Sequence, residues 1–254
     1  MIEVKNVTKS FGDLTVLHDV SAVFESGKTN LIIGQSGSGK TVLMKSVIGI
    51  HQVDKGQILY DGRDIAAMGK KEMAKLRQEV GMLFQGSALF DSMTVEQNVR
   101  FPLEMFSDKT RKEWDERVDF CLNRVGLSHA AKLFPSEISG GMQKRAAIAR
   151  AIVLQPKYLF CDEPNSGLDP RTSLTIDQLI HEITQEFNIT TVVNTHDMNS
   201  VMEIGDHVIF IHKGHKGWDG DKETIFSSGN QDLEDLVFAS NLYKKVKKYH
   251  NLEL

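Results

Sequence analysis

The spacing of apolar and polar residues divides the chain into a β-rich beginning and a helical middle. Near the N-terminus, short apolar runs are separated by glycines, which is typical of strands and turns. The segment Thr29–Ile33 ends in three large apolar residues and predicts a buried strand. Between residues 92 and 154 apolar side chains recur at helical spacing. The elements that we expect in these parts are strands around 2–7 and over 16–24, 29–33 and 57–60, helices over 94–106 and 111–125, and a helix with one apolar face made of Met142, Ala146, Ala149 and Val153.

Strands and helices alternate after Pro156. Asp169 followed by Pro170 is a start signal for a helix, with the aspartate as the N-cap. Such alternation implies a mostly parallel sheet that is covered by helices and binds its ligands at the carboxyl ends of its strands. The expected strands are 158–161, 190–194 and 207–211, with helices at 171–187 and 197–203 between them.

Composition narrows the class of protein. The 254 residues are 41% hydrophobic and 25% charged, which excludes a disordered or fibrous chain. The net charge of −4 offers no overall basic field, so we expect no nucleic-acid partner. No apolar run is long enough for a membrane span or a signal peptide. The two cysteines are too few for a disulfide framework, and Cys161 is expected to pack in the core. We expect one compact cytoplasmic domain.

A phosphate-binding loop is the strongest chemical signal. Residues 34–41 match G-x-x-x-x-G-K-[ST] between a predicted strand and a predicted helix. Glycines let backbone N–H groups face an anion, Lys40 would neutralise the β- and γ-phosphates, and the Thr41 hydroxyl would bind Mg²⁺. The alternative is a glycine-rich turn without a ligand. The predicted nucleotide-binding residues here are Gly34, Gln35, Ser36, Gly37, Ser38, Gly39, Lys40 and Thr41.

Two acids follow the apolar strand at 158–161. Asp162 would hold Mg²⁺, and Glu163 would polarise the attacking water. The alternative is that two acids merely end a strand. His196 follows another apolar strand, which would run parallel to the first, so its imidazole could reach the γ-phosphate. His212 and His215 are expected to flank a hairpin turn rather than to bind a metal.

The segment Ile-Ser-Gly-Gly-Met at 138–142 resembles the Leu-Ser-Gly-Gly-Gln signature of the ATP-binding cassette (ABC) family. Other family motifs follow in the family's order. Phe11 matches the aromatic residue that stacks on adenine, Gln85 matches the hinge glutamine, and Ser166 to Asp169 match the loop after the acidic pair. His196 matches the switch histidine. The resemblance extends from Phe11 to about residue 226.

The resemblance implies the fold and the domain organisation. The expected fold is α/β, a P-loop NTPase of the ABC-ATPase type with a RecA-like, mostly parallel core, an N-terminal antiparallel β subdomain and an inserted helical subdomain. A single domain over 1–254 would consist of a core with the β subdomain at 1–85 and 156–230, a helical signature subdomain at 86–155 and a C-terminal helical tail at 231–254.

The resemblance also implies a site that takes ATP and Mg²⁺. Glu163 and His196 would be catalytic, and Thr41, Gln85 and Asp162 would bind the metal and the nucleotide. In the family, the signature turn of one subunit caps the ATP held by the other in a head-to-tail homodimer. The residues that would act in trans are Ser139, Gly140 and Gly141. A Ser-Gly-Gly turn at a helix N-terminus is physically suited to an anion, although it also serves simply as an N-cap.

Departures from the general family pattern point to a branch. Met142 replaces the usual glutamine, and residues 86–103 and 126–151 resemble the ATPase of Mla-type transporters. That group powers a membrane permease linked to Mce-domain proteins and moves phospholipids between membranes. We therefore expect a peripheral protein on the inner face of the inner membrane. The alternatives are the ATPase of an importer or exporter for another solute, and a non-transport cassette acting on DNA or the ribosome.

Two segments are candidates for partner contacts. An apolar stretch between residues 84 and 106 would form a groove for a permease helix, or else pack in the core. The lysine-rich end at 243–249 would either touch lipid headgroups or be a solvated helix face. Glu234, Leu236, Val237 and Leu242 suggest a helix that packs on a second subunit. The apolar residues of the stretch are Phe84, Leu89, Phe90, Met93, Phe101, Leu103 and Phe106.

Overall fold

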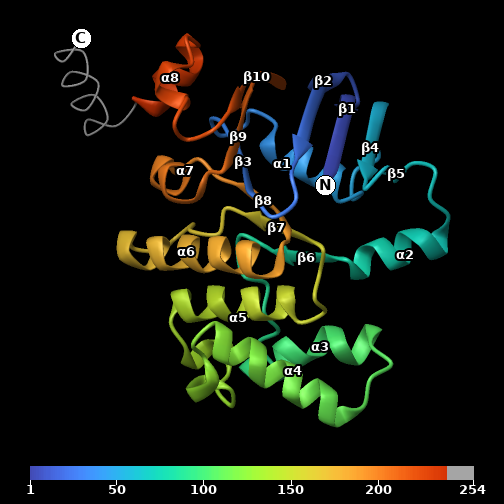
Figure 1. Cartoon of the computed structure of the whole chain (residues 1–254), viewed down its shortest axis with the longest axis vertical. Helices are drawn as coiled ribbons and strands as arrows, with labels where there is room; N and C mark the ends of the chain where they lie inside the picture. Colours follow the sequence, from blue (N-terminus) through green and yellow to red (C-terminus); the bar gives the residue numbers. More distant parts are fainter. Residues whose placement is uncertain (239–254) are drawn as a thin grey trace.

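The computed structural model describes residues 1–238, so Leu242 and the lysine-rich end lie outside the described residues. The described elements form two sheets and their covering helices (Figure 1). The strands are β1 (Ile2–Phe11), β2 (Leu14–Phe24), β3 (Thr29–Ile33), β4 (Lys55–Tyr60), β5 (Arg63–Asp64), β6 (Val80–Leu83), β7 (Tyr158–Asp162), β8 (Thr190–Asn194), β9 (His207–His212) and β10 (His215–Gly220). The helices are α1 (Lys40–Val47), α2 (Lys70–Gln78), α3 (Val95–Phe106), α4 (Arg111–Arg124), α5 (Gly140–Ile152), α6 (Pro170–Phe187), α7 (Met198–Ile204) and α8 (Gln231–Val237).

The larger sheet has the order β10-β9-β3-β8-β7-β6. Its strands from β9 to β6 are parallel, and only β10 is antiparallel. The smaller sheet, in the order β2-β1-β4-β5, is antiparallel. These arrangements confirm the predicted α/β fold with a mostly parallel core and an N-terminal antiparallel part. His212 and His215 flank the hairpin turn between β9 and β10, as expected.

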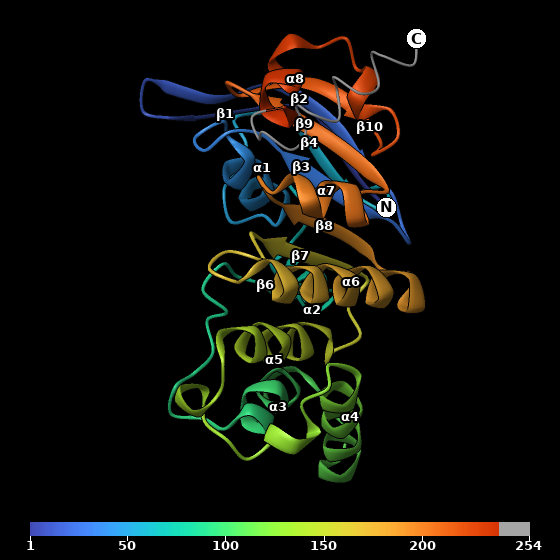
Figure 2. The ribbon, with the colours of Figure 1, turned by 90° about the vertical axis from the view of Figure 1, so that its left-hand side faces the viewer.

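The large sheet separates two hydrophobic clusters. Side chains alternate between the faces of a strand. Accordingly, Ile32 of β3 packs with α1 and the antiparallel sheet, whereas its neighbours Leu31 and Ile33 pack in the cluster on the opposite face. Figure 2 shows α1 beside the antiparallel sheet and α6 on the other side, toward α3, α4 and α5. The carboxyl ends of β3, β7 and β8 thus lie between two packed layers, which fix the loops that follow them.

The helices α3, α4 and α5 make up most of the region 86–155. Figures 1 and 2 both place α5 between α6 and the pair α3 and α4. Most of α5 is buried, because it packs on both sides. Its residues belong to the same hydrophobic cluster as α6 and one face of the large sheet. The helical region therefore shares its core with the parallel sheet instead of enclosing one of its own.

Helix α6 begins as the sequence predicts. The Asp169 side chain accepts hydrogen bonds from the N–H groups of Arg171 and Thr172, both at 3.1 Å, and Pro170 occupies the first helical position. Helix α8 packs on this chain's own core through Val237, which is 1% exposed. The expectation that this helix contacts a second subunit stays a prediction. Among residues 1–238, no helix has the length and apolarity required to cross a bilayer.

Candidate nucleotide site

The loop between β3 and α1 is built to expose its backbone. Gly34 has a φ of 150° and Gly39 one of 109°, values that residues with a Cβ rarely adopt. A Cβ on Gly34 would lie 2.2 Å from the carbonyl oxygen of Ile211 in β9, so the loop is pressed against the sheet at this point. Helix α1 starts directly after the loop, at Lys40. Curled backbone and a helix N-terminus together form a site for an anion.

Lys40 lies inside this curl. Its Nζ donates hydrogen bonds to the carbonyl oxygens of Gly34 at 2.8 Å and Gln35 at 3.1 Å. The residue is 5% exposed, and burial lowers the pKa of the ammonium, although Glu163 and Asp162 act in the opposite direction. Close by, the Ser38 hydroxyl is buried without a hydrogen-bond partner among the described residues. A buried cation beside an unused hydroxyl suits phosphate oxygens.

Asn194 connects the phosphate loop to the acidic strand. Its Nδ2 donates to Asp162 Oδ1 at 2.7 Å and to Thr41 Oγ1 at 3.1 Å. The side chain is fully buried at the end of β8, next to Asp162 on β7. Our reading of the sequence missed Asn194. The available signal was a polar residue that ends an apolar strand predicted to run beside the acidic one.

The oxygens of Thr41 and Asp162 suit Mg²⁺, which prefers oxygen ligands and retains water and substrate phosphates in its coordination shell. Asn194 Oδ1 is also buried and has no partner among residues 1–238. Within the same residues, no three His, Cys, Asp or Glu side chains form a complete metal site. The protein's own oxygens therefore fit a magnesium ion that arrives with a nucleotide.

Glu163 contacts two other residues singled out from the sequence. Its Oε1 lies 3.1 Å from His196 Nδ1, and its Oε2 accepts a hydrogen bond from Gln85 Nε2 at 3.3 Å. Glu163 has a φ of 46°, and its N–H donates to the Asn194 carbonyl oxygen at 2.8 Å. A non-glycine residue with such a φ costs free energy and marks a constrained position. The His196 side chain is 63% exposed, so this pair is open to solvent.

Gln85 was expected to bind the metal with Thr41 and Asp162, but its contacts differ. Besides Glu163, its Nε2 donates to Ser166 Oγ at 3.3 Å. Its carbonyl oxygen accepts a hydrogen bond from Lys144 of α5, a nearly buried lysine whose pKa is lowered by burial. Gln85 thus joins the helical region to the loop that carries Glu163, and no hydrogen bond among the described residues joins it to Thr41 or Asp162.

The remaining predicted residues lie apart from this group. Phe11 is 45% exposed and meets the His51 ring edge-on, with 5.2 Å between ring centroids. Ser139 is the N-cap of α5, and its Oγ accepts a hydrogen bond from the Met142 N–H at 3.3 Å. Gly140 begins α5, and a Cβ on Gly141 would lie 2.6 Å from Thr172 Cγ2. Among residues 1–238, no hydrogen bond connects this turn to the phosphate loop.

An apolar groove lies between β6 and the helical region. Phe84, Phe90 and Phe106 are exposed along it, whereas Leu103 is buried. Leu103 therefore packs in the core, as one alternative expects, whereas the three phenylalanines line a groove. That the groove receives a permease helix stays a prediction. The groove is lined by Arg77, Val80, Gly81, Met82, Phe84, Ala88, Phe90, Phe101, Pro102, Phe106, Arg150, Ala151 and Leu154.

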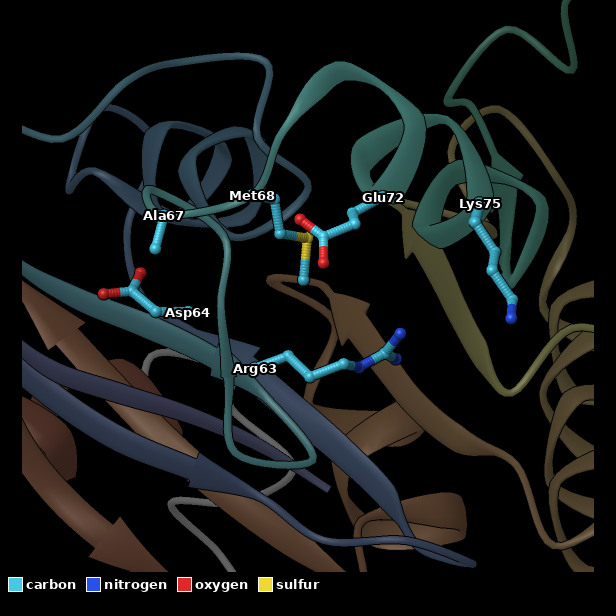
Figure 3. A pocket seen from close by; sticks show the side chains of 6 residues that line it. All are labelled: Arg63, Asp64, Ala67, Met68, Glu72 and Lys75. Atoms are coloured by element: carbon cyan, nitrogen blue, oxygen red, sulfur yellow. The ribbon is translucent and has the colours of Figure 1, made fainter.

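A separate cavity lies beside α2 and contains none of the predicted site residues. Figure 3 shows its lining side chains, which come from β5, α2 and the connection between them. Arg63 is paired with Glu79 at 2.6 Å. The cavity is lined by Arg63, Asp64, Ala67, Met68, Glu72 and Lys75.

Known proteins resemble this chain over most of its length. The "Probable ribonucleotide transport ATP-binding protein mkl" of Mycobacterium leprae is 40% identical over 89% of this chain, which spans only 65% of that relative. The "Methionine import ATP-binding protein MetN" of Clostridium tetani is 38% identical over 95% of this chain and 76% of its own length.

A solved structure, the dimeric post-hydrolysis state of the ATP-binding cassette MJ0796 bound to ADP and Pi, superposes with a TM-score of 0.78. It is 30% identical to this chain and covers 87% of it, and the match includes 99% of that cassette. The family model described as "ABC transporter" matches residues 17–166. The chain therefore belongs to the ABC transporter family and has the ABC-ATPase fold.

Proposed function

We propose that this chain is the ATP-binding and ATP-hydrolysing subunit of an ABC transporter. The observation that carries the proposal is the contact between Glu163 and His196 at the carboxyl edge of the sheet, on strands whose ends also carry Asp162 and Asn194. A base and a histidine in the loops that follow two adjacent parallel strands can act together on one water molecule near the phosphates held by the loop around Lys40.

In this proposal each residue has a distinct role. Lys40 neutralises the β- and γ-phosphates, and the 34–41 backbone binds their oxygens. Mg²⁺, when bound, would neutralise charge that develops on the phosphates, and Thr41, Asp162 and Gln85 would hold it. Glu163 accepts a proton from the attacking water. His196 holds that water and the γ-phosphate in line.

A homodimer would complete each site. The turn Ser139, Gly140 and Gly141 would cap the ATP held by the second copy, and Phe11 would stack on its own adenine. The exposure of Ser139 and Phe11 supports this arrangement, as does the dimeric state named for the cassette bound to ADP and Pi. The apolar groove with Phe84, Phe90 and Phe106 would receive a helix of a membrane permease. The chain would then lie on the cytoplasmic face of the inner membrane.

Two cargo classes follow from different observations. The names of the relatives, methionine import and ribonucleotide transport, favour a small solute. The resemblance of residues 86–103 and 126–151 to Mla-type ATPases favours phospholipid transport with an Mce-domain partner. To distinguish the two cargo classes, the Glu163→Gln protein is purified in mild detergent with Mg-ATP, and the proteins that accompany it are identified by mass spectrometry. A permease that co-purifies with an Mce-domain protein supports lipid transport, and one with another binding protein excludes it.

Hydrolysis is tested on the purified full chain. We expect Glu163→Gln to lower kcat at least about 100-fold while it retains ATP, because loss of a general base costs roughly 10²–10⁴ in rate. Lys40→Ala should abolish ATP binding. Glu223→Gln, the same change at an exposed glutamate away from the site, is the matched control. Normal turnover by the Glu163→Gln protein would refute the assignment of the base.

A further inference from the structure

A buried polar network lies behind the contact between Glu163 and His196. Asn165 Nδ2 donates hydrogen bonds to Asp177 Oδ2 at 2.8 Å and to Ser200 Oγ at 3.0 Å. The Ser200 hydroxyl also hydrogen-bonds to Asp177. Asp177 is 2% exposed and Ser200 is 1% exposed. Three side chains from three segments of the chain thus form a hydrogen-bonded triangle, in which Asp177 and Ser200 are buried and Asn165 is half-buried.

The triangle joins the two segments that carry the proposed catalytic pair. Asn165 lies two residues after Glu163, in the loop between β7 and α6. Ser200 lies in α7, which begins two residues after His196. Asp177 projects from α6, the helix that packs beside α7 in Figure 1. The same two segments therefore touch at the Glu163–His196 contact, at 3.1 Å, and again through Asp177.

Asp177 is an unfavourable choice if stability alone is considered. Its Oδ1 and the Oδ1 of Asn165 are buried with no hydrogen-bond partner among the described residues. Asp197 and Glu203 lie near enough to disfavour its charge further. Replacing a buried charged group by a well-packed apolar one is often neutral or stabilising. The retained carboxylate is better explained by the geometry that it imposes on Asn165 and Ser200.

We propose that Asp177 is a positioning residue for ATP hydrolysis, which holds the Glu163 loop and the His196 segment in register by binding Asn165 and Ser200. This inference rests on the proposed function. During hydrolysis Glu163 and His196 must both hydrogen-bond to the attacking water, so their mutual contact cannot hold the two segments together. The triangle then maintains the distance between the Glu163 loop and the His196 segment. A misplacement of a catalytic group by about 1 Å can lower the rate roughly 100-fold.

The test compares substitutions in the full chain. Asp177→Leu removes the acceptor, and we expect kcat to fall at least 10-fold with the KM for ATP changed less than twofold, because the phosphate loop is untouched. Asp177→Asn retains an oxygen that can accept from Asn165, so its kcat should stay within threefold of the natural protein. Thr184→Val is the matched control, since Thr184 is another fully buried, hydrogen-bonded residue of α6.

Activity is normalised to the fraction of chains that bind a fluorescent ATP analogue, so that unfolded protein does not count. Ser200→Ala is a milder variant that remains informative if Asp177→Leu does not fold, and its kcat should fall at least threefold at unchanged KM. Unchanged kcat in every foldable variant overturns the inference. So does an equal loss in Thr184→Val, or failure of Asp177→Asn to restore turnover. Absence of ATP hydrolysis by the natural protein would instead refute the proposed function, and with it the inference.

Discussion

Asp177 should make the stability of the protein depend on pH in a way that one substitution removes. Burial is the main cause that raises the pKa of this carboxyl from 3.8 to about 6, against the hydrogen bonds from Ser200 and Asn165. The folded state therefore holds the proton more tightly than the unfolded state between these values. The contribution of Asp177 is most favourable below pH 3.8 and is lost as the pH rises through about 6. A shift of about two pKa units corresponds to roughly 3 kcal/mol.

Asp177→Asn abolishes this titration and leaves every other ionisable group in place. We expect the free energy of unfolding of the variant, relative to the natural protein, to increase by about 2 kcal/mol between about pH 4.5 and pH 8. Guanidinium chloride unfolding of both proteins across this range measures the difference. Charges on Asp197 and Glu203, which also face Asp177, act in the same direction. A difference that does not change with pH would refute the raised pKa and the argument from burial.

Three further changes probe the site and the core. Asn194→Ala removes two hydrogen bonds that align Thr41 and Asp162, so we expect kcat and Mg²⁺ affinity to fall at least about 10-fold, as titration of the ATPase with Mg²⁺ would measure. Gly34→Ala forces a Cβ against a β9 carbonyl, and unfolding experiments should show a loss of at least about 2 kcal/mol, with ATP binding weakened. Cys121 and Cys161 are buried and burial raises their thiol pKa values, so neither should react with iodoacetamide before denaturation.

The parts of the fold with a strong apolar pattern were predictable. Strands β3 and β8 were predicted with the bounds that they have, because each contains consecutive large apolar residues, Leu31 to Ile33 in β3 and Val192 and Val193 in β8, as buried parallel strands do. Helix α6 carried its own start signal at Asp169. Helix α2 and strand β6 were not predicted. Leu76 is the only buried residue within α2, so this helix has no apolar face at helical spacing. Strand β6 is only four residues long, and its Gly81 lies against the carbonyl group of Ala151 in α5, so its sequence lacks the apolar run of a buried strand.

Some residues of the candidate site belong to a local sequence motif and were predictable, whereas others contact residues distant in the sequence and were not. Lys40 is recognisable because its partners, Gly34 and Gln35, lie within the same motif. Asn194 was missed because its partners are distant in sequence and meet only where β8 lies between β3 and β7. A motif search detects groups that bind the phosphates. Side chains that align those groups, such as Asn194, match no motif and are recognised from which strands lie side by side.

Asn194 and the Asp177 triangle show why such positioning residues concentrate around Glu163 and His196. Parallel strands end in loops that are separate in sequence, so nothing covalent fixes the distance between one loop and the next. Asn194 fixes the distance between the loop around Lys40 and the strand that carries Asp162. Asp177 fixes the distance between the Glu163 loop and α7. Both are buried and polar, and each binds two segments at once. Substitutions in the triangle should therefore lower kcat more than ATP affinity, whereas substitutions of Lys40 should lower ATP affinity more than kcat.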